Sequence, residues 1–242
     1  MPERLLLHMT QIHIPGVNRL LALLPEEDYR QLSPFLEHVT TPIKQSIYEA
    51  NKPVPYVYFP LSMVTSLLVT LHDGIIVEIA TVGNEGIVGL PVFLGADTIP
   101  GSAIVQIPGE AMRMASAPFR EAFEYLPSLR NLLQRYTQAL FTLVAQSVAC
   151  NRAHTIQQRC ARWLLMTQDR IGSEQFALTQ EFLAEMLGVR RAGVSEVASN
   201  LQQAGFIQYT RGMITVLDRA GLEDVTCECY WVVRDEFERT LN

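Results

Sequence analysis

The spacing of hydrophobic positions changes along the chain, and each change predicts a different kind of element. Residues 17–39 have apolar positions at helical spacing, and Pro25 followed by three acidic residues is typical of a helix start. From Ile43 to about Ala115 the apolar runs are short, rich in β-branched and aromatic residues, and separated by Gly or Pro. Evenly spaced strands of this kind predict a sandwich or a closed roll. The segments are YVYFPL, MVTSLLVTL, GIIVEIATVG, GIVGLPVFLG, SAIVQIP and EAMRMA, with a hairpin turn at His72-Asp73-Gly74.

A long helical section follows, opened by Ala117-Pro118 and restarted at Pro127. One apolar stripe then advances by alternating steps of four and three residues over three heptads, the pattern of a coiled-coil seam. A second stripe on the same helix can pack on the helix's own domain, and a helix packed only on that domain is the alternative interpretation. We predict that the first stripe forms the interface between two copies of the chain. Its residues are Leu129, Leu133, Tyr136, Leu140, Leu143 and Ser147.

The polar residues 151–154 predict a hinge, and the helix after it is expected to end near Ile171-Gly172. Two short amphipathic helices come next, in TQEFLAEMLGVRRAGVSEVASNLQQAGFI. Thr179 is a good N-cap for the first helix, and Gly188 breaks the chain between the two. The second helix is expected to run from about Arg190 to Ala204, with a β-hairpin after it in FIQYTRGMITVLD.

Helix, turn, helix and hairpin in this order are typical of a winged helix-turn-helix, whose second helix enters the major groove of DNA. The chain as a whole is acidic, with 19 Lys+Arg against 25 Asp+Glu. Residues 150–221, however, have 8 basic and 6 acidic residues, and every basic one is Arg. Attraction to phosphate is local and screened over about 8 Å, so this segment can bind DNA. The predicted DNA-binding residues are Thr179, Gln180, Arg190, Arg191, Ser195, Glu196, Ser199 and Arg211.

Length and composition narrow the class further. A chain of 242 residues with 48% hydrophobic and 18% charged residues predicts one large or two modest folded domains. We find no apolar run of the roughly 18 residues that a membrane span needs, and no signal-peptide core. Four unevenly placed cysteines favour a reducing compartment over a disulfide scaffold. We therefore expect a soluble cytoplasmic protein.

From about residue 17 to 222 the chain resembles the Crp–Fnr family of bacterial transcription factors, named after the catabolite activator and the fumarate–nitrate regulator. The motifs are QRCARWLL (158–165), LTQEFLAEMLGVRRAGVSEVASNLQQAGFI (178–207) and VGNEGIVGL (82–90). The resemblance implies an α+β fold made of a cyclic-nucleotide-binding-like β-roll, a dimerisation helix and a winged helix-turn-helix. It also implies a homodimer that binds an inverted repeat in double-stranded DNA, with RNA polymerase as a further partner. The expected divisions are 1–126, 127–153 and 154–242.

The resemblance carries over to single positions only in part. Arg191 matches the family's leading base-contacting arginine, whereas the usual Glu falls on Ala192 and a second usual Arg falls on Glu196. The mode of binding is therefore expected to hold, but the family's familiar target sequence is not.

A ligand pocket in the roll is the next question. Family members that bind cyclic nucleotides hold the phosphate with an Arg-Ser pair, and the Arg position falls here on Gly101. No Lys or Arg occurs between Lys52 and Arg113, and a buried phosphate without a cation is costly. We therefore expect no cyclic AMP, although a cyclic-nucleotide-responsive regulator stays as the alternative. A pocket for a less charged effector and a roll without any ligand are both open; the candidate residues are Glu85, Gly86, Ser102, Ala103 and Val144.

The sequence gives weak support for a metal site or for an enzymatic function. Iron–sulfur members of the family need four thiolates, three of them usually near the N-terminus, and no Cys precedes Cys150. Cys150 is read as an inert thiol on the seam, and Cys227, Cys229 and the acidic tail stay unassigned. No metal and no cofactor are predicted. A metal-dependent β-barrel enzyme needs a His-rich triad, but residues 43–115 contain only His72. With no nucleophile elbow, P-loop or paired-carboxylate motif, we predict that the chain is not an enzyme.

Overall fold

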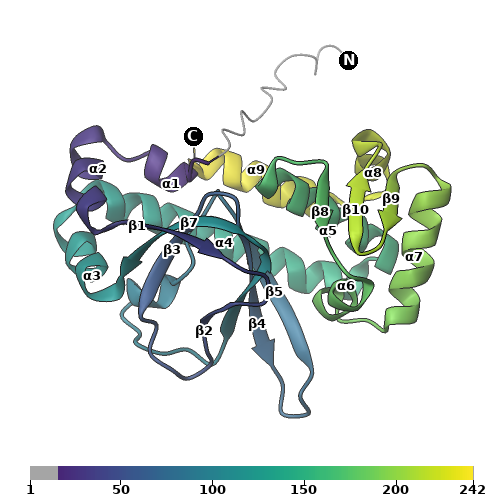
Figure 1. The fold of residues 1–242 in the computed structure, drawn as a ribbon, viewed down its shortest axis with the longest axis horizontal. Helices are drawn as coiled ribbons and strands as arrows, with labels where there is room; N and C mark the ends of the chain where they lie inside the picture. Colours follow the sequence, from purple (N-terminus) through teal and green to yellow (C-terminus); the bar gives the residue numbers. More distant parts are fainter. Residues whose placement is uncertain (1–15, 242) are drawn as a thin grey trace.

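Seven strands form an antiparallel β-roll in the computed structural model, which describes residues 16–241 (Figure 1). One sheet has the strand order β1-β7-β3, and the other has the order β2-β6-β4-β5. Each sheet pairs strands that are distant in sequence, which is why the roll closes around a single core. The bounds are β1 (Glu37–Thr41), β2 (Ser46–Tyr48), β3 (Tyr56–Pro60), β4 (Val64–Thr70), β5 (Ile76–Val82), β6 (Ser102–Ile107) and β7 (Gly109–Ala115).

Most predicted strands are confirmed, and the β4–β5 hairpin turns at Gly74, whose φ of 83° suits glycine. The strand prediction for GIVGLPVFLG is wrong. This segment holds a 3-10 turn, η2 (Leu90–Val92), and its backbone pairs with a strand at an isolated bridge between Val88 and Tyr58. Pro91 has no N–H for a ladder, and Gly89 has a φ of 116° that ends any extended run. Strand β1 also begins before the predicted boundary at Ile43.

Short helices precede the roll, and two more follow it. α1 (Arg19–Ala22) is capped by Asn18, and α2 (Glu26–Leu32) begins after Pro25 as predicted; a 3-10 turn, η1 (Ser33–Phe35), leads into β1. After the roll come α3 (Ser116–Tyr125) and α4 (Pro127–Ala153). The break at Leu126 has a local cause, because a residue before proline is pushed out of helical conformation while proline itself suits the first helical position.

The stripe that was expected to join two copies lies inside the protomer, so that prediction needs a correction. Its side chains are only 0–8% exposed and belong to the chain's own core. Gly86 packs directly under the Tyr136 ring, and Phe237 meets the same ring edge-on at 6.1 Å. The heptad spacing is real, but this face of α4 packs on β5 and on a C-terminal helix of the same chain. The residues to which this correction applies are Leu129, Leu133, Tyr136, Leu140, Leu143 and Ser147.

The C-terminal part begins after a two-residue break. α5 (Ile156–Ile171) starts with a capping box, in which Thr155 accepts from the backbone of Gln158 and the Gln158 side chain returns to Thr155. A three-stranded sheet of order β8-β10-β9 follows, interleaved with helices. The elements are β8 (Gln175–Ala177), α6 (Gln180–Leu187), α7 (Arg191–Gln203), β9 (Ile207–Thr210), β10 (Met213–Val216), α8 (Arg219–Val225) and α9 (Glu228–Leu241).

Helix α9 is the main element that the sequence interpretation missed. It lies along α4, as the yellow helix in Figure 1 shows, and buries one side against it. The signal was present in the tail, because its apolar residues recur at steps of three and four, but its acidic charge masked them. The residues that α9 buries include Tyr230, Val233, Phe237 and Leu241.

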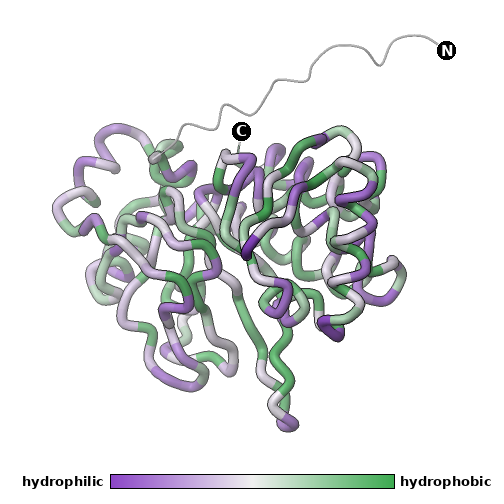
Figure 2. Tube along the Cα trace, turned by 45° about the vertical axis from the view of Figure 1, so that its right-hand side comes forward, coloured by the Kyte–Doolittle hydropathy of each residue, from purple (hydrophilic) through white to green (hydrophobic). Residues whose placement is uncertain are grey.

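Figure 2 shows that hydrophobic segments run through the interior of both halves. The β4–β5 hairpin projects from the roll with hydrophobic legs and a hydrophilic tip. Leu71 and Ile75 near this tip are about half exposed. Among residues 16–241, no helix is long and apolar enough to cross a membrane.

The contact between Gly86 and Tyr136 yields a stability prediction. A methyl group at position 86 would fall inside van der Waals contact of the buried Tyr136 ring. Gly86→Ala should therefore lower the free energy of unfolding by about 1–3 kcal/mol, the usual cost of overpacking a core. Urea denaturation followed by circular dichroism measures this.

Gly193→Ala is the matched control. Gly193 lies inside α7, and a methyl group there meets only the end of Ile156 at 3.4 Å. This variant should gain up to about 1 kcal/mol from helix propensity. Equal stability of the two variants would contradict the packing of Gly86 against Tyr136.

Candidate nucleic-acid interface

The two helices of the predicted DNA-binding unit meet at a tight turn. Thr179 caps α6, its Oγ1 accepting from the backbone N–H of Phe182 at 3.1 Å. Gly188 ends α6 in the left-handed conformation with a φ of 61°, and α7 begins only three residues later at Arg191. Glycine is suited to this position because it has no Cβ penalty there. Both helices and their turn are as the sequence predicted.

Apolar faces hold the two helices together and leave the other faces outside. A polar contact fixes their first turns, because the Ser195 hydroxyl donates to Gln180 Oε1 at 2.7 Å. The orientation of α7 is thereby set from both ends of its contact with α6. The buried side chains are Phe182, Leu183, Met186 and Leu187 on α6, and Val194, Val197, Ala198 and Leu201 on α7.

Three arginines lie at the exposed edge of this unit. Arg190 is the N-cap residue of α7, Arg191 is its first helical residue, and Arg211 lies in the turn between β9 and β10. All three are exposed, and within residues 16–241 no carboxylate forms an ion pair with any of them. Positive φ values of 52° at Arg211 and 78° at Gly212 give the mirror-image turn that suits a two-residue hairpin. The α7 dipole adds positive potential at the end where Arg190 and Arg191 lie.

Most of the predicted DNA-binding residues lie at the surface of this unit. Some of their polar groups already form hydrogen bonds within the protein. The Thr179 hydroxyl caps α6, and Gln180 is partly buried and accepts a hydrogen bond from Ser195. Glu196 and Ser199 are exposed on α7. Their contacts with DNA remain predictions, and Glu196 places an acidic group close to the basic edge.

Comparisons with known proteins identify this unit. The family model described as Crp-like helix-turn-helix domain matches residues 158–225. Residues 158–225 form a Crp-like helix-turn-helix domain. The resemblance to the Crp–Fnr family seen in the sequence is confirmed, and so is the predicted α+β fold with its β-roll.

Solved structures extend the likeness to most of the chain. A putative Crp/Fnr-family regulator from Eubacterium rectale has 16% identity and a TM-score of 0.66, over 88% of this chain and 98% of that one. FixK2 from Bradyrhizobium japonicum has 18% identity and a TM-score of 0.68, over 79% and 98%. The c-di-GMP responsive regulator CLP from Xanthomonas campestris has 13% identity and a TM-score of 0.64, over 79% and 99%. At these identities the likeness shows a shared fold. A comparison with curated protein sequences gives no match.

Glu85, expected to line an effector pocket, is already bound inside the protein. Its carboxylate accepts from Arg170 Nε at 3.0 Å and from the backbone N–H of Gly83 at about 3.1 Å. Both side chains of the Glu85–Arg170 pair are more than 90% buried. Arg170 belongs to α5 of the Crp-like domain, so this pair joins the roll to that domain. The carboxylate is therefore already paired inside the protein, and a role for Glu85 at an effector pocket stays a prediction.

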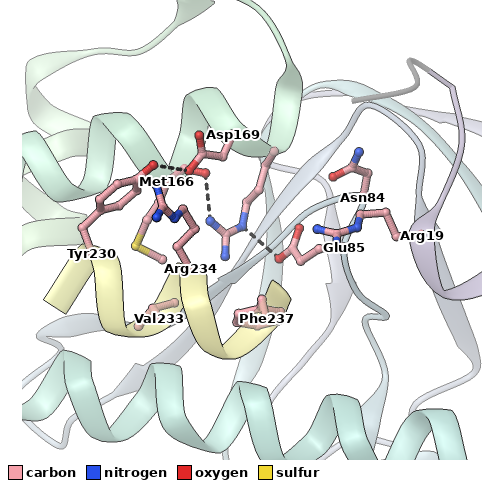
Figure 3. A pocket seen from close by; sticks show the side chains of 10 residues that line it. Arg19, Asn84, Glu85, Met166, Asp169, Tyr230, Val233, Arg234 and Phe237 are labelled. Atoms are coloured by element: carbon pink, nitrogen blue, oxygen red, sulfur yellow. Dashed lines mark hydrogen bonds and ion pairs between the residues drawn. The ribbon is translucent and has the colours of Figure 1, made fainter. Parts of the chain in front are cut away.

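None of the remaining pocket candidates lines the cavity that Glu85 lines. Gly86 lies against Tyr136, while Ser102 and the fully buried Ala103 are on β6. Val144 is half-buried on α4. Glu85 lines a small cavity of about 50 Å³ between the roll, α5 and α9 (Figure 3). Its other lining residues are Arg19, Asn84, Met166, Asp169, Arg170, Tyr230, Val233, Arg234 and Phe237.

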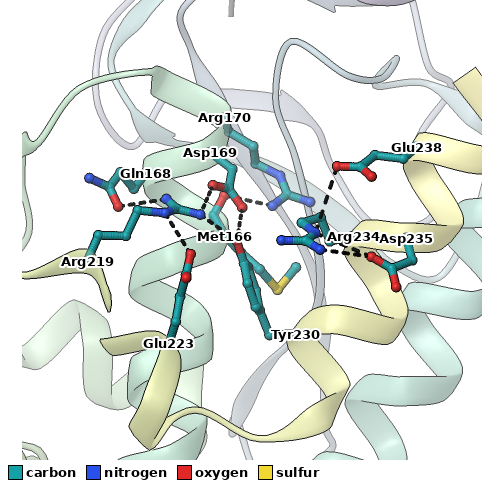
Figure 4. Close-up of polar contacts among 10 residues, drawn as sticks. All are labelled: Met166, Gln168, Asp169, Arg170, Arg219, Glu223, Tyr230, Arg234, Asp235 and Glu238. Carbon is teal, nitrogen blue, oxygen red and sulfur yellow. Dashed lines mark hydrogen bonds and ion pairs between the residues drawn. The ribbon is translucent and has the colours of Figure 1, made fainter. Parts of the chain in front are cut away.

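A polar network ties α9 to the Crp-like domain next to this cavity (Figure 4). The Tyr230 hydroxyl donates to Asp169 at 2.9 Å and accepts from Arg219 Nη2 at 2.6 Å. Arg219 also pairs with Asp169 at 2.8 Å and with Glu223 at 2.8 Å. One network of hydrogen bonds and ion pairs therefore joins helices α5, α8 and α9. Tyr230 and Asp169 could not be paired from sequence, because they are far apart along the chain.

A second joint links the roll to α5. The Trp163 indole N–H donates to Glu78 Oε1 at 3.0 Å, while Glu78 Oε2 is buried with no partner among the described residues. Burial is the largest influence on this carboxyl and raises its pKa to about 7, against the lowering effect of its hydrogen bonds. The protonation state of this joint therefore changes near neutral pH.

This raised pKa predicts how stability depends on pH. The folded state holds the Glu78 proton up to about pH 7, whereas the unfolded chain releases it near pH 4.5, so the stabilisation is lost as pH rises between these values. Glu78→Gln keeps an acceptor for Trp163 and cannot ionise. It should match the wild type below pH 4.5 and exceed its stability by about 1–3 kcal/mol at pH 8.

Urea midpoints measured from pH 4 to pH 8 check this, with the exposed Glu121→Gln as control. A stability gap between Glu78→Gln and wild type that does not grow with pH would show that Glu78 is not protonated in the folded joint.

Proposed function

We propose that the chain is a homodimeric, sequence-specific regulator of transcription that reads an inverted repeat in double-stranded DNA. The observation that carries the proposal is the exposed basic edge of the Crp-like domain. Arg190 and Arg191 at the start of α7 and Arg211 in the wing lack carboxylate partners among the described residues. Arg bidentate to guanine is the commonest specific base contact, and a cation on the wing suits a phosphate.

The dimer is proposed to use the opposite face of α4 from the one predicted. Positions 134, 138, 141, 145, 148 and 152 also follow alternating steps of four and three, and all are exposed. Phe141 and Val148 on this face are each 69% exposed, and Ala145 lies between them. Large apolar side chains at a/d spacing on an exposed helix face favour a coiled-coil partner. A second copy of α4 satisfies that spacing along its whole length.

Two-fold symmetry then sets the DNA site. Two copies of α7 should lie about 34 Å apart, one turn of duplex, and should read half-sites in opposite orientation. RNA polymerase is a further proposed partner of the DNA-bound dimer, and the cytoplasm is the proposed place of action. We propose no catalytic activity for this chain.

The roll is proposed to respond to something other than a cyclic nucleotide. Gly101 stands at the position of the phosphate-binding Arg, and Glu85 is held by Arg170. The neighbour CLP is described as c-di-GMP responsive, so a cyclic-nucleotide-responsive regulator stays as the alternative. An effector that enters near Glu85 would compete with the ion pair that joins the roll to the Crp-like domain.

Selection of random duplex DNA on the purified chain tests the proposed function. The selection is run without added ligand at two salt concentrations. An enriched inverted repeat with half-sites one helical turn apart supports the proposal. Salt-sensitive binding with no enriched sequence would contradict sequence-specific reading by the chain alone.

Arginine variants separate base reading from phosphate contact. Arg191→Ala should cost about 1–3 kcal/mol on the enriched site and relax one base position. Arg211→Ala should weaken binding to every sequence and reduce the slope of affinity against salt concentration. Fluorescence anisotropy titrations on cognate and scrambled duplexes measure both. An equal loss for Arg191→Ala on both duplexes would show that Arg191 contacts only phosphate.

The dimer interface has its own test. Phe141→Glu places a charge at the centre of the exposed α4 face and should shift the chain from dimer to monomer in analytical ultracentrifugation. Its far-ultraviolet circular dichroism should stay unchanged, because the side chain contributes little to the protomer core. Leu94→Glu, at another exposed apolar residue, is the control and should leave the dimer intact. A stable dimer of Phe141→Glu would place the interface elsewhere.

A further inference from the structure

Three of the four cysteines and one histidine come together beside the break between α4 and α5. Cys150 and His154 lie one turn apart at the end of α4, so that both face the same side of the helix. Cys227 and Cys229 lie where α8 gives way to α9. The two segments are about 75 residues apart in sequence, yet the four ligand atoms lie within 4.8 Å of one another.

The distances suit one tetrahedral ion. Cys150 Sγ and Cys227 Sγ are 3.5 Å apart, and Cys229 Sγ and His154 Nδ1 are 3.6 Å apart. A zinc ion with bonds of about 2.3 Å to sulfur and about 2.0–2.1 Å to nitrogen holds its ligand atoms about 3.5–3.8 Å apart. A cluster of several metal atoms would hold its ligands further apart than this group allows. We propose that Cys150, His154, Cys227 and Cys229 bind a single zinc ion.

The three cysteines of this group are buried, but they do not belong to the main hydrophobic core. Cys150, Cys227 and Cys229 are 0–2% exposed and form a small buried cluster of their own, apart from the main core. The fourth cysteine, Cys160, lies in the main core, where burial raises the pKa of its thiol to about 12. Cys160 is thus a structural thiol, whereas the other three converge on a histidine nitrogen.

The histidine is oriented as metal-bound histidines usually are. Its Nδ1 faces the thiols, and its other ring nitrogen, Nε2, lies 3.2 Å from the Glu228 carboxylate. A carboxylate on the far nitrogen fixes the tautomer and the ring orientation, which raises the affinity of such a ligand for metal. Glu228 is the first residue of α9, between the two cysteines in sequence, so one turn supplies two thiols and the orienting carboxylate.

Charge also balances around the group. Zinc with three thiolates carries one net negative charge, and the buried guanidinium of Arg162 supplies one positive charge. Among the described residues, Arg162 Nε and Nη1 have no hydrogen-bond partner. Arg162 Nη2 donates to Ser147 at 3.4 Å, and a metal thiolate group near its other two nitrogens would lower the cost of burying this cation.

The ion would fasten α9 across the hinge. α4 ends at Ala153, and Thr155 already caps α5, so the site lies directly beside the two-residue break. α9 covers the inner face of α4 and is tied to α5 through Tyr230 and Asp169. Zinc at this point therefore fixes the angle between the long helix and the Crp-like domain. The site has four protein ligands and no open position, which is typical of a structural ion.

Elemental analysis of the full-length chain, purified under reducing conditions, tests the proposal. One zinc per chain is expected for wild type and for Cys160→Ser, and a loss of most of the zinc is expected for Cys227→Ser. Metal content is measured without DNA, so its outcome is independent of the proposed regulatory function.

Two measurements guard against a Cys227→Ser variant that does not fold. Cobalt added to metal-free wild type should give the intense visible bands of a tetrahedral thiolate site. Glu228→Gln should weaken zinc affinity about 10–100-fold in competition with a chelator, because His154 loses its orienting partner. Glu236→Gln, which changes a carboxylate paired with Arg239 on the same helix, should leave the affinity unchanged.

Three outcomes would overturn the proposal. Wild type that binds neither zinc nor cobalt would show that the cysteines are ordinary core thiols. A disulfide between Cys150 and Cys227 in the chain purified without reductant would assign the group to redox chemistry. An iron–sulfur chromophore would replace the single ion by a cluster.

Discussion

Helix α4 is the element on which the rest of the molecule depends, because two of its faces are apolar and must be covered in different ways. Its inner face is buried by the roll and by α9 of the same chain. Its outer face leaves Phe141 and Val148 in solvent. Burial of apolar area is the dominant favourable term in folding and association. Covering the inner face therefore drives folding of the protomer, and we propose that covering the outer face pairs two protomers.

Helix α5 holds the polar contacts that join the parts of the protein. The Glu85–Arg170 pair and the Glu78–Trp163 hydrogen bond connect the roll to α5, while Tyr230 and Asp169 connect α5 to α9. Breaking one partner of a buried pair is strongly destabilising, so the two halves have a defined relative position. In the proposed function, a signal in the roll would act on these contacts to change how the Crp-like domain binds DNA.

Local sequence was sufficient for the elements whose shape is set by nearby residues. Thr179, Gly188 and the Arg211-Gly212 turn determine helix starts and turns through their own backbone preferences, and the structure has each of them in place. Pro127 likewise marks the start of α4. The Crp-like unit was predicted on this basis and is confirmed by the match over residues 158–225.

Long-range pairing could not be read in the same way. The heptad period of α4 is correct, but the period alone does not say whether a stripe meets another chain or the same one. That answer depends on α9, whose apolar side was hidden in an acidic tail. Glu85 was matched to a family position without its partner, because Arg170 is 85 residues away. Cys150 was interpreted as an inert thiol, and Cys227 and Cys229 were left unassigned, for the same reason. Their spacing relative to His154 becomes meaningful only once α4 and α9 lie side by side.

The structure of the chain bound to its selected DNA tests the central claim most directly. We predict two copies related by a two-fold axis, with Phe141, Ala145 and Val148 of both at the axis and the α7 helices in major grooves about 34 Å apart. α9 should stay on the inner face of α4 in each copy. A complex in which α9 has left that face, with Leu133 and Leu140 of two copies in contact instead, would contradict the account.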